Sequence, residues 1–141
     1  MAGPDVLVVG AGPAGLAGAA ELSRRGADCL VLERGEAVGD SWRRHYDGLH
    51  LHTAAFLSEL PGLGYPREEG LWVARPAFVH YLEAYARHHR LRVRTGTEVR
   101  RVERDGPGWA VITDAGTLSA STVVLATGQN RVPNVPSWPG L

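Results

Sequence analysis

The sequence predicts an α/β fold: a parallel sheet with flanking helices, and a three-stranded β-meander, within residues 1–131. Three continuous apolar runs are typical of strands buried on both faces: 5–9, 29–32 and 122–126. Helical patterns separate these runs, and strands that alternate with helices favour a parallel sheet. The length of 141 residues suits one domain.

The first run leads into a Gly-x-Gly-x-x-Gly turn, residues 10–15, and then into a helix. Gly10 suits a tight turn, Gly12 lets the backbone approach a pyrophosphate, and Gly15 lets the helix pack closely on the strand. Pro13 fits the first helical turn, where a missing N–H is harmless. The helix would present its free N–H groups and positive dipole end to phosphates. This predicts a dinucleotide site in a Rossmann-like domain, with a purely structural Gly-rich turn as the alternative.

Glu33 ends the second run. A carboxylate at this position accepts hydrogen bonds from ribose hydroxyls and repels a 2′-phosphate, which disfavours NADP at this site. The spacing alone does not separate FAD from NAD.

Residues 34–75 show no clear period. Long loops in compact domains are usually functional or disordered, and the aromatic residues of this segment, among them Trp42, Tyr46, Phe56 and Tyr65, argue against disorder. We therefore expect a loop with short helical pieces that covers a ligand. A scaffold helix is expected over 76–89, because Pro76 suits its start and its apolar residues recur at helical spacing.

The last third of the chain predicts a short strand at 91–95 and then the meander. Its strands are expected at 98–104, 109–113 and 117–119, because these segments alternate apolar and polar residues between Gly-containing turns. The Pro-rich tail, 132–141, reads as a linker.

Composition excludes several classes of function. The net charge of +0 suggests neither nucleic acid nor an anionic membrane as a partner. All 15 basic residues are arginines, so P-loop lysine and Schiff-base chemistry are excluded. Cys29 is the single cysteine, no apolar run has transmembrane length, and the six histidines lack companions that complete a metal site. These features predict a cytoplasmic protein without metal or membrane anchor.

Three stretches carry a family resemblance: Val8–Gly15 with Leu32–Arg34, then Ser41–Thr53, then Val124–Gln129. Together they resemble the N-terminal FAD-binding segment of the flavin-containing and Baeyer–Villiger monooxygenase superfamily, nearest to its YUCCA-like branch. The resemblance covers essentially the whole chain and implies FAD as the dinucleotide. It implies these cofactor-binding residues: Gly10, Gly12, Pro13, Ala14, Gly15, Glu33, Arg34, Ser41, Trp42, Val99, Ala126, Thr127 and Gly128.

Each group of residues has an implied place along the cofactor. The glycine turn would hold the pyrophosphate, Glu33 the adenosine ribose, and Arg34 with the Val99 backbone the adenine. Ser41 and Trp42 would approach the flavin, and residues 126–128 would pass close to the cofactor.

The implied activity is NADPH-dependent oxygenation of a small organic substrate by O₂ through a flavin C4a-(hydro)peroxide. Many relatives place Asn or Asp near the flavin where this chain has His50–Thr53. His52 or Thr53 would then hydrogen-bond the flavin or its peroxide; alternatively they satisfy only the loop backbone.

The second Gly-x-Gly-x-x-Gly, which binds NADPH in relatives, is missing from this sequence. We therefore expect the first part of an enzyme, incomplete relative to the family and inactive alone, that self-associates or pairs with a complementing chain. Two alternatives stay open: a stand-alone nucleotide-binding module without turnover, and an NAD-binding oxidoreductase fragment.

Overall fold

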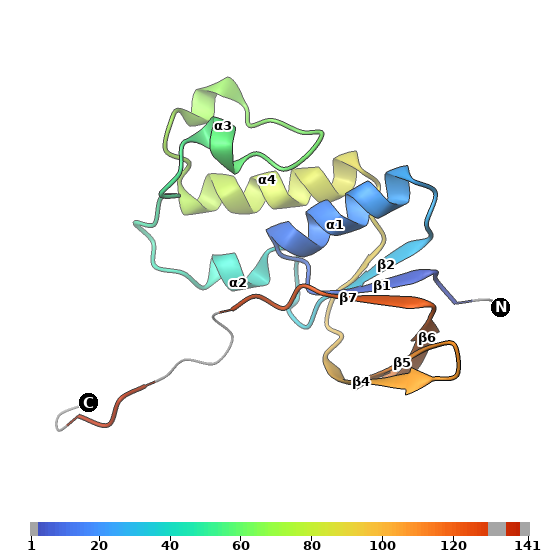
Figure 1. Cartoon of the computed structure of the whole chain (residues 1–141). Helices are drawn as coiled ribbons and strands as arrows, with labels where there is room; N and C mark the ends of the chain where they lie inside the picture. Colours follow the sequence, from blue (N-terminus) through green and yellow to red (C-terminus); the bar gives the residue numbers. More distant parts are fainter. Residues whose placement is uncertain (1–2, 130–134, 139–141) are drawn as a thin grey trace.

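The computed structural model describes residues 3–129 and 135–138. A parallel sheet carries helices α1 (Pro13–Arg24) and α4 (Arg75–His88) on one face and a three-stranded antiparallel sheet on the other (Figure 1). The predicted α/β fold with its meander is therefore confirmed.

The parallel sheet has the strand order β3-β2-β1-β7. Its strands are β1 (Val6–Val9), β2 (Cys29–Leu32), β3 (Val93–Arg94) and β7 (Thr122–Leu125). Every residue of β1 and β2 is buried, as their continuous apolar runs predict. The strand predicted at 91–95 was too long, because the Leu91 amide closes the end of α4 on the Ala86 carbonyl instead (2.9 Å).

Side chains of the central strands alternate between two cores. Val8 and Val31 point toward α1 and α4, whereas Leu7 and Leu32 point toward the antiparallel sheet and contact its Val111. Strands β1 and β2 are thus buried on both faces, and this packing holds their carboxyl ends in place.

The antiparallel sheet is a meander of β4 (Val99–Asp105), β5 (Gly108–Thr113) and β6 (Gly116–Ala120). Gly106 (φ +57°) and Gly116 (φ +121°) supply the left-handed backbone that its two turns require.

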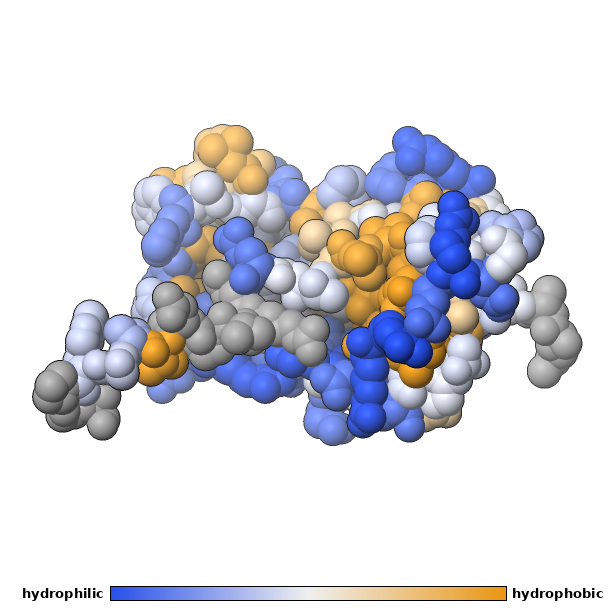
Figure 2. Space-filling model, turned by 60° about the horizontal axis from the view of Figure 1, so that its bottom comes forward, coloured by the Kyte–Doolittle hydropathy of each residue, from blue (hydrophilic) through white to orange (hydrophobic). Residues whose placement is uncertain are grey.

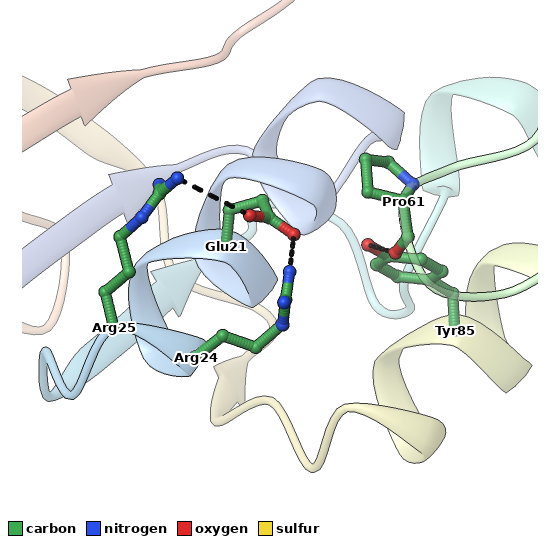
Figure 3. A network of polar contacts seen from close by, with 5 residues as sticks. All are labelled: Glu21, Arg24, Arg25, Pro61 and Tyr85. Carbon is green, nitrogen blue, oxygen red and sulfur yellow. Dashed lines mark hydrogen bonds and ion pairs between the residues drawn. The ribbon is translucent and has the colours of Figure 1, made fainter.

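The long loop holds three short helical pieces, as expected: α2 (Asp40–Arg43), α3 (Ala55–Ser58) and the 3₁₀ turn η1 (Arg67–Glu69). Two tyrosines of α4 anchor it. The Tyr81 hydroxyl accepts from the Leu60 amide (2.7 Å) and donates to the Leu63 carbonyl (2.6 Å). The Tyr85 hydroxyl donates to the Pro61 carbonyl (2.7 Å; Figure 3). Burial raises the pKa of both phenols, so they stay protonated donors.

Strand β7 pairs with β1 and, among the described residues, with no second strand. Its last residue, Leu125, is 68% exposed. Figure 2 shows an apolar patch in the middle of the face on which β7 and the antiparallel sheet lie. An apolar edge strand of this kind is a template for pairing with another strand.

No helix within residues 3–129 and 135–138 is long and apolar enough to cross a membrane. Of the predicted linker, residues 135–138 have no regular secondary structure. Residues 132–134 and 139–141 of that linker lie outside the described residues.

Candidate functional site

Three segments meet where β1, β2 and β7 end at the same edge of the parallel sheet (Figure 1). They are the glycine turn (residues 10–15), Glu33, and residues 126–128. The Gly10 amide donates to the Leu32 carbonyl (2.8 Å) and the Ala126 amide to the Val9 carbonyl (2.9 Å). In open α/β sheets, ligands bind beyond the carboxyl ends of the strands, so this edge is the candidate site.

Two glycines of the turn are required by the protein itself. Gly10 has φ +109°, and a Cβ there would lie 2.4 Å from the Ala126 carbonyl oxygen. A Cβ on Gly15 would lie 1.9 Å from the Gly10 carbonyl oxygen, so only glycine lets α1 approach the turn this closely.

Gly12 is different, because nothing in the protein lies within 4 Å of a Cβ built on it. It is the N-cap of α1, provides no side-chain cap, and is followed by Pro13 and a first turn without an acidic residue. The amides of Ala14 and Gly15 therefore lack helical partners, and the positive dipole end of α1 is uncompensated. This open space in front of free amides fits an anionic group such as a pyrophosphate.

Glu33, which follows β2, is hydrogen-bonded through its side chain to the glycine turn that follows β1. Its carboxylate oxygens accept hydrogen bonds from the Ala11 amide and from the Gly35 amide, both at 2.8 Å. Each oxygen keeps a second lone pair for a ligand hydroxyl. The carboxylate thus shapes the glycine turn, a role that the sequence did not predict.

The residues that were predicted to lie near the adenine are adjacent to Glu33. The Thr97 amide donates to the Glu33 carbonyl (2.9 Å) and the Gly96 amide to the Gly35 carbonyl (2.8 Å). These bonds bring the start of β4, with Val99, beside residues 33–35. Arg34 is exposed, so its guanidinium is open to a ligand.

Ser41 and Trp42 lie on α2, whose start is tied to the glycine turn. The Gly39 amide donates to the Ala11 carbonyl (3.0 Å). Ser41 is exposed. The Trp42 ring packs edge-on against Phe78 of α4, with centroids 4.5 Å apart. Trp42 is therefore partly a core residue.

His52 and Thr53 are exposed in the loop between α2 and α3. The Thr53 hydroxyl lies 2.6 Å from the Ser58 hydroxyl, within the loop. No contact recorded in the described chain joins these two residues to the glycine turn. The hydrogen bonds of Thr53 stay within residues 53–58 of the loop.

The groups with shifted pKa values lie away from this edge. Burial raises the pKa of the Cys29 thiol and of the Tyr65 phenol, and lowers the pKa of His89. Two surface cavities, about 390 and 440 Å³, also lie elsewhere: one beside Trp109, the other beside Val38 and Arg90. The site is thus defined by backbone amides and shape rather than by perturbed side chains.

Thr97, Tyr81 and Arg75 shape the surroundings of the site through their hydrogen bonds, but none of them was predicted. Tyr81, Tyr85 and His89 recur at every fourth position, so the sequence could have predicted that they share one face of the helix. Thr97 and Arg75 carried no such signal.

Comparison with known proteins gives one family and one fold. The family described as pyridine nucleotide-disulphide oxidoreductase matches residues 7–141. The indole-3-pyruvate monooxygenase YUCCA1 of Oryza sativa subsp. japonica is 42% identical over 142 residues, covering 98% of this chain and 35% of that protein. This chain thus spans about a third of the length of the curated relatives it matches.

Two solved structures of monooxygenases have the same fold as this chain. The flavin-containing monooxygenase from Stenotrophomonas maltophilia superposes with a TM-score of 0.88 at 31% identity, covering 98% of this chain and 42% of that chain. An oxidized steroid monooxygenase bound to NADP gives 0.83 at 28% identity, covering 98% of this chain and 28% of that chain.

Proposed function

Because this chain belongs to the pyridine nucleotide-disulphide oxidoreductase family and the predicted resemblance to flavin monooxygenases is confirmed, we propose that it is the FAD-binding portion of an NADPH-dependent flavin monooxygenase. One observation carries the cofactor site. The uncapped start of α1 opens onto free space at Gly12, between Glu33 and residues 126–128.

The residues present fit FAD. The amides of Ala14 and Gly15 would donate to the pyrophosphate, with no side chain at Gly12 to obstruct it. The remaining lone pairs of Glu33 would accept ribose hydroxyls, and its charge disfavours a 2′-phosphate. Residues 126–128 and Ser41 would flank the cofactor on either side of the turn. When bound, FAD supplies the redox chemistry, taking electrons from NADPH and passing them to O₂.

We also propose that the enzyme oxygenates a small organic substrate and that it is located in the cytoplasm. NADPH would bind to a part of the enzyme outside these 141 residues. Indole-3-pyruvate is the first substrate to test, because a relative at 42% identity is named for acting on it. His52 and Thr53 remain candidates for contact with the flavin.

The first experiment is an absorption spectrum of the purified chain, recorded again after FAD is added and the excess removed. Flavin bands that stay with the protein support the cofactor assignment. A flat spectrum together with NAD binding in a titration would favour an NAD-binding oxidoreductase fragment, and binding of neither nucleotide would refute a dinucleotide site.

The second experiment uses the full-length gene product with NADPH, O₂ and candidate substrates. Substrate-dependent NADPH oxidation supports the monooxygenase. Stable flavin without any NADPH oxidation would favour the alternative of a nucleotide-binding module. Self-association, which the apolar edge of β7 supports, is measured by sedimentation at several concentrations.

A further inference from the structure

Arg75 occupies a position where local structure disfavours arginine. It is the first residue of α4, so its charge faces the positive end of the helix dipole, and no acidic residue in the first turn compensates it. Its side chain is nevertheless only 18% exposed. The reason for an arginine here must therefore lie in tertiary contacts.

The hydrogen bonds of the Arg75 side chain all go to one turn of the loop, residues 43–47, whereas its backbone amide donates to the Leu49 carbonyl (2.8 Å). Nη1 donates to the Arg43 carbonyl (2.8 Å) and also to the His45 carbonyl, and Nη2 donates to Asp47 Oδ1 (2.7 Å). The Asp47 side chain is 99% exposed, so that ion pair is screened and contributes little. The two carbonyl bonds carry the interaction, because the end of a helix leaves such carbonyls without partners.

This turn is the exit of α2, the helix that carries Ser41 and Trp42. At its entrance, the Gly39 amide is bound to the Ala11 carbonyl of the glycine turn (3.0 Å). At its exit, Arg43 pairs with Glu83 of α4, and Arg75 binds the carbonyls that follow. Helix α2 has only four residues and cannot hold its own conformation. Its position is therefore determined by these fixed ends together with the packing of Trp42 on Phe78.

We propose that Arg75 is a positioning residue for the cofactor site: it holds the turn at 43–47 and thereby keeps Ser41 and Trp42 beside the glycine turn. Arg75 acts through α2 and does not touch the cofactor. The inference about the cofactor rests on the proposed FAD site, whereas the restraint on the turn does not depend on it.

The test uses the full chain with Arg75→Gln, the conservative Arg75→Lys, and Arg87→Gln as the control on the last turn of α4. The rate of trypsin cleavage after Arg43 and Arg44 measures how firmly the turn is held, because both arginines lie within the restrained segment. The chain has no lysine, so trypsin cleaves only after arginines. We expect Arg75→Gln to speed cleavage after these two arginines by about tenfold, with Arg87→Gln unchanged. Lysine keeps the positive charge but lacks the planar guanidinium that binds the carbonyls through Nη1 and Asp47 through Nη2, so Arg75→Lys should rescue only partly.

FAD titration of the same proteins is the second readout. Arg75→Gln should weaken FAD binding by about tenfold while the control binds like the wild type. Unchanged cleavage at 43 and 44 would overturn the restraint, and faster cleavage with unchanged FAD affinity would overturn the positioning role. If the wild type binds no FAD, the proposed function fails while the cleavage rates still decide the restraint. If Arg75→Gln does not fold by circular dichroism, Arg75→Lys decides both points.

Discussion

Replacing Gly12 by valine should abolish FAD binding and leave the fold intact. Gly12 has φ −82° and ψ −178°, an extended conformation that any residue adopts. A Cβ there meets nothing within 4 Å. The free energy of unfolding should therefore fall by only about 1 kcal/mol, because valine is a poorer N-cap residue than glycine but meets no steric clash.

The loss of binding can be estimated from the amides that the new side chain would screen. A pyrophosphate at this helix start would accept from Ala14 and Gly15. Hydrogen bonds to a charged group contribute about 1.5–3 kcal/mol each, so losing two costs about 3–6 kcal/mol. This corresponds to an affinity about 10² to 10⁴ times lower.

The assay is FAD titration by flavin fluorescence, paired with thermal unfolding of the apoprotein. Gly18→Val is the matched control, because Gly18 lies on the same helix and a Cβ there also meets nothing within 4 Å. Gly15→Val should instead prevent folding, since its Cβ would lie 1.9 Å from the Gly10 carbonyl oxygen. A Gly12→Val protein that folds and binds FAD within about threefold of the wild-type affinity would refute the site.

Three further substitutions test other parts of the structure. Glu33→Ala should weaken FAD binding by about 1–3 kcal/mol, because hydrogen bonds to a charged group are lost; equal affinity in calorimetric titration would show that Glu33 only shapes the turn. Arg90 follows α4 with φ +51°, so Arg90→Gly should raise the free energy of unfolding in urea by about 0.5–1 kcal/mol, and a decrease would contradict the strain argument. Burial lowers the pKa of His89, so the unfolded chain takes up its proton first as pH falls, and stability should drop below about pH 6.5. His89→Gln should flatten that drop in unfolding curves recorded from pH 5 to 8; an unchanged pH slope would assign it to other groups.

The elements that could be predicted are those in which local pattern and burial agree. The run at 29–32 matches β2, because a strand buried on both faces needs every residue apolar. The run at 122–126 nearly matches β7 in its bounds, but its expected burial on both faces was wrong. Thr122 and Leu125 are exposed, because β7 lies at the edge of the sheet. The meander boundaries fall within a residue of the expected ones, because Gly-containing turns fix them. The strand at 91–95 was overestimated because its first residue serves the end of a helix, which periodicity does not reveal.

The site was predictable where glycine chemistry defines it and unpredictable where side chains reach across the chain. The roles of Gly10 and Gly15 follow from the motif, and the structure shows the close contacts that require them. The bonds from the Glu33 carboxylate to the Ala11 amide and from Arg75 to the turn at 43–47 span 22 to 32 residues. Such contacts depend on the assembled fold and leave no local pattern in the sequence.

The bonds that hold the glycine turn also bear on how fast a cofactor can enter. Three residues from two other segments already fix the turn: Leu32 and Glu33 at the end of β2, and Gly39 before α2. Folding alone therefore orders the backbone that a nucleotide would meet. An arriving cofactor would lose little affinity to ordering of this backbone, and its association rate would depend on encounter and loss of water rather than on rearrangement of the turn.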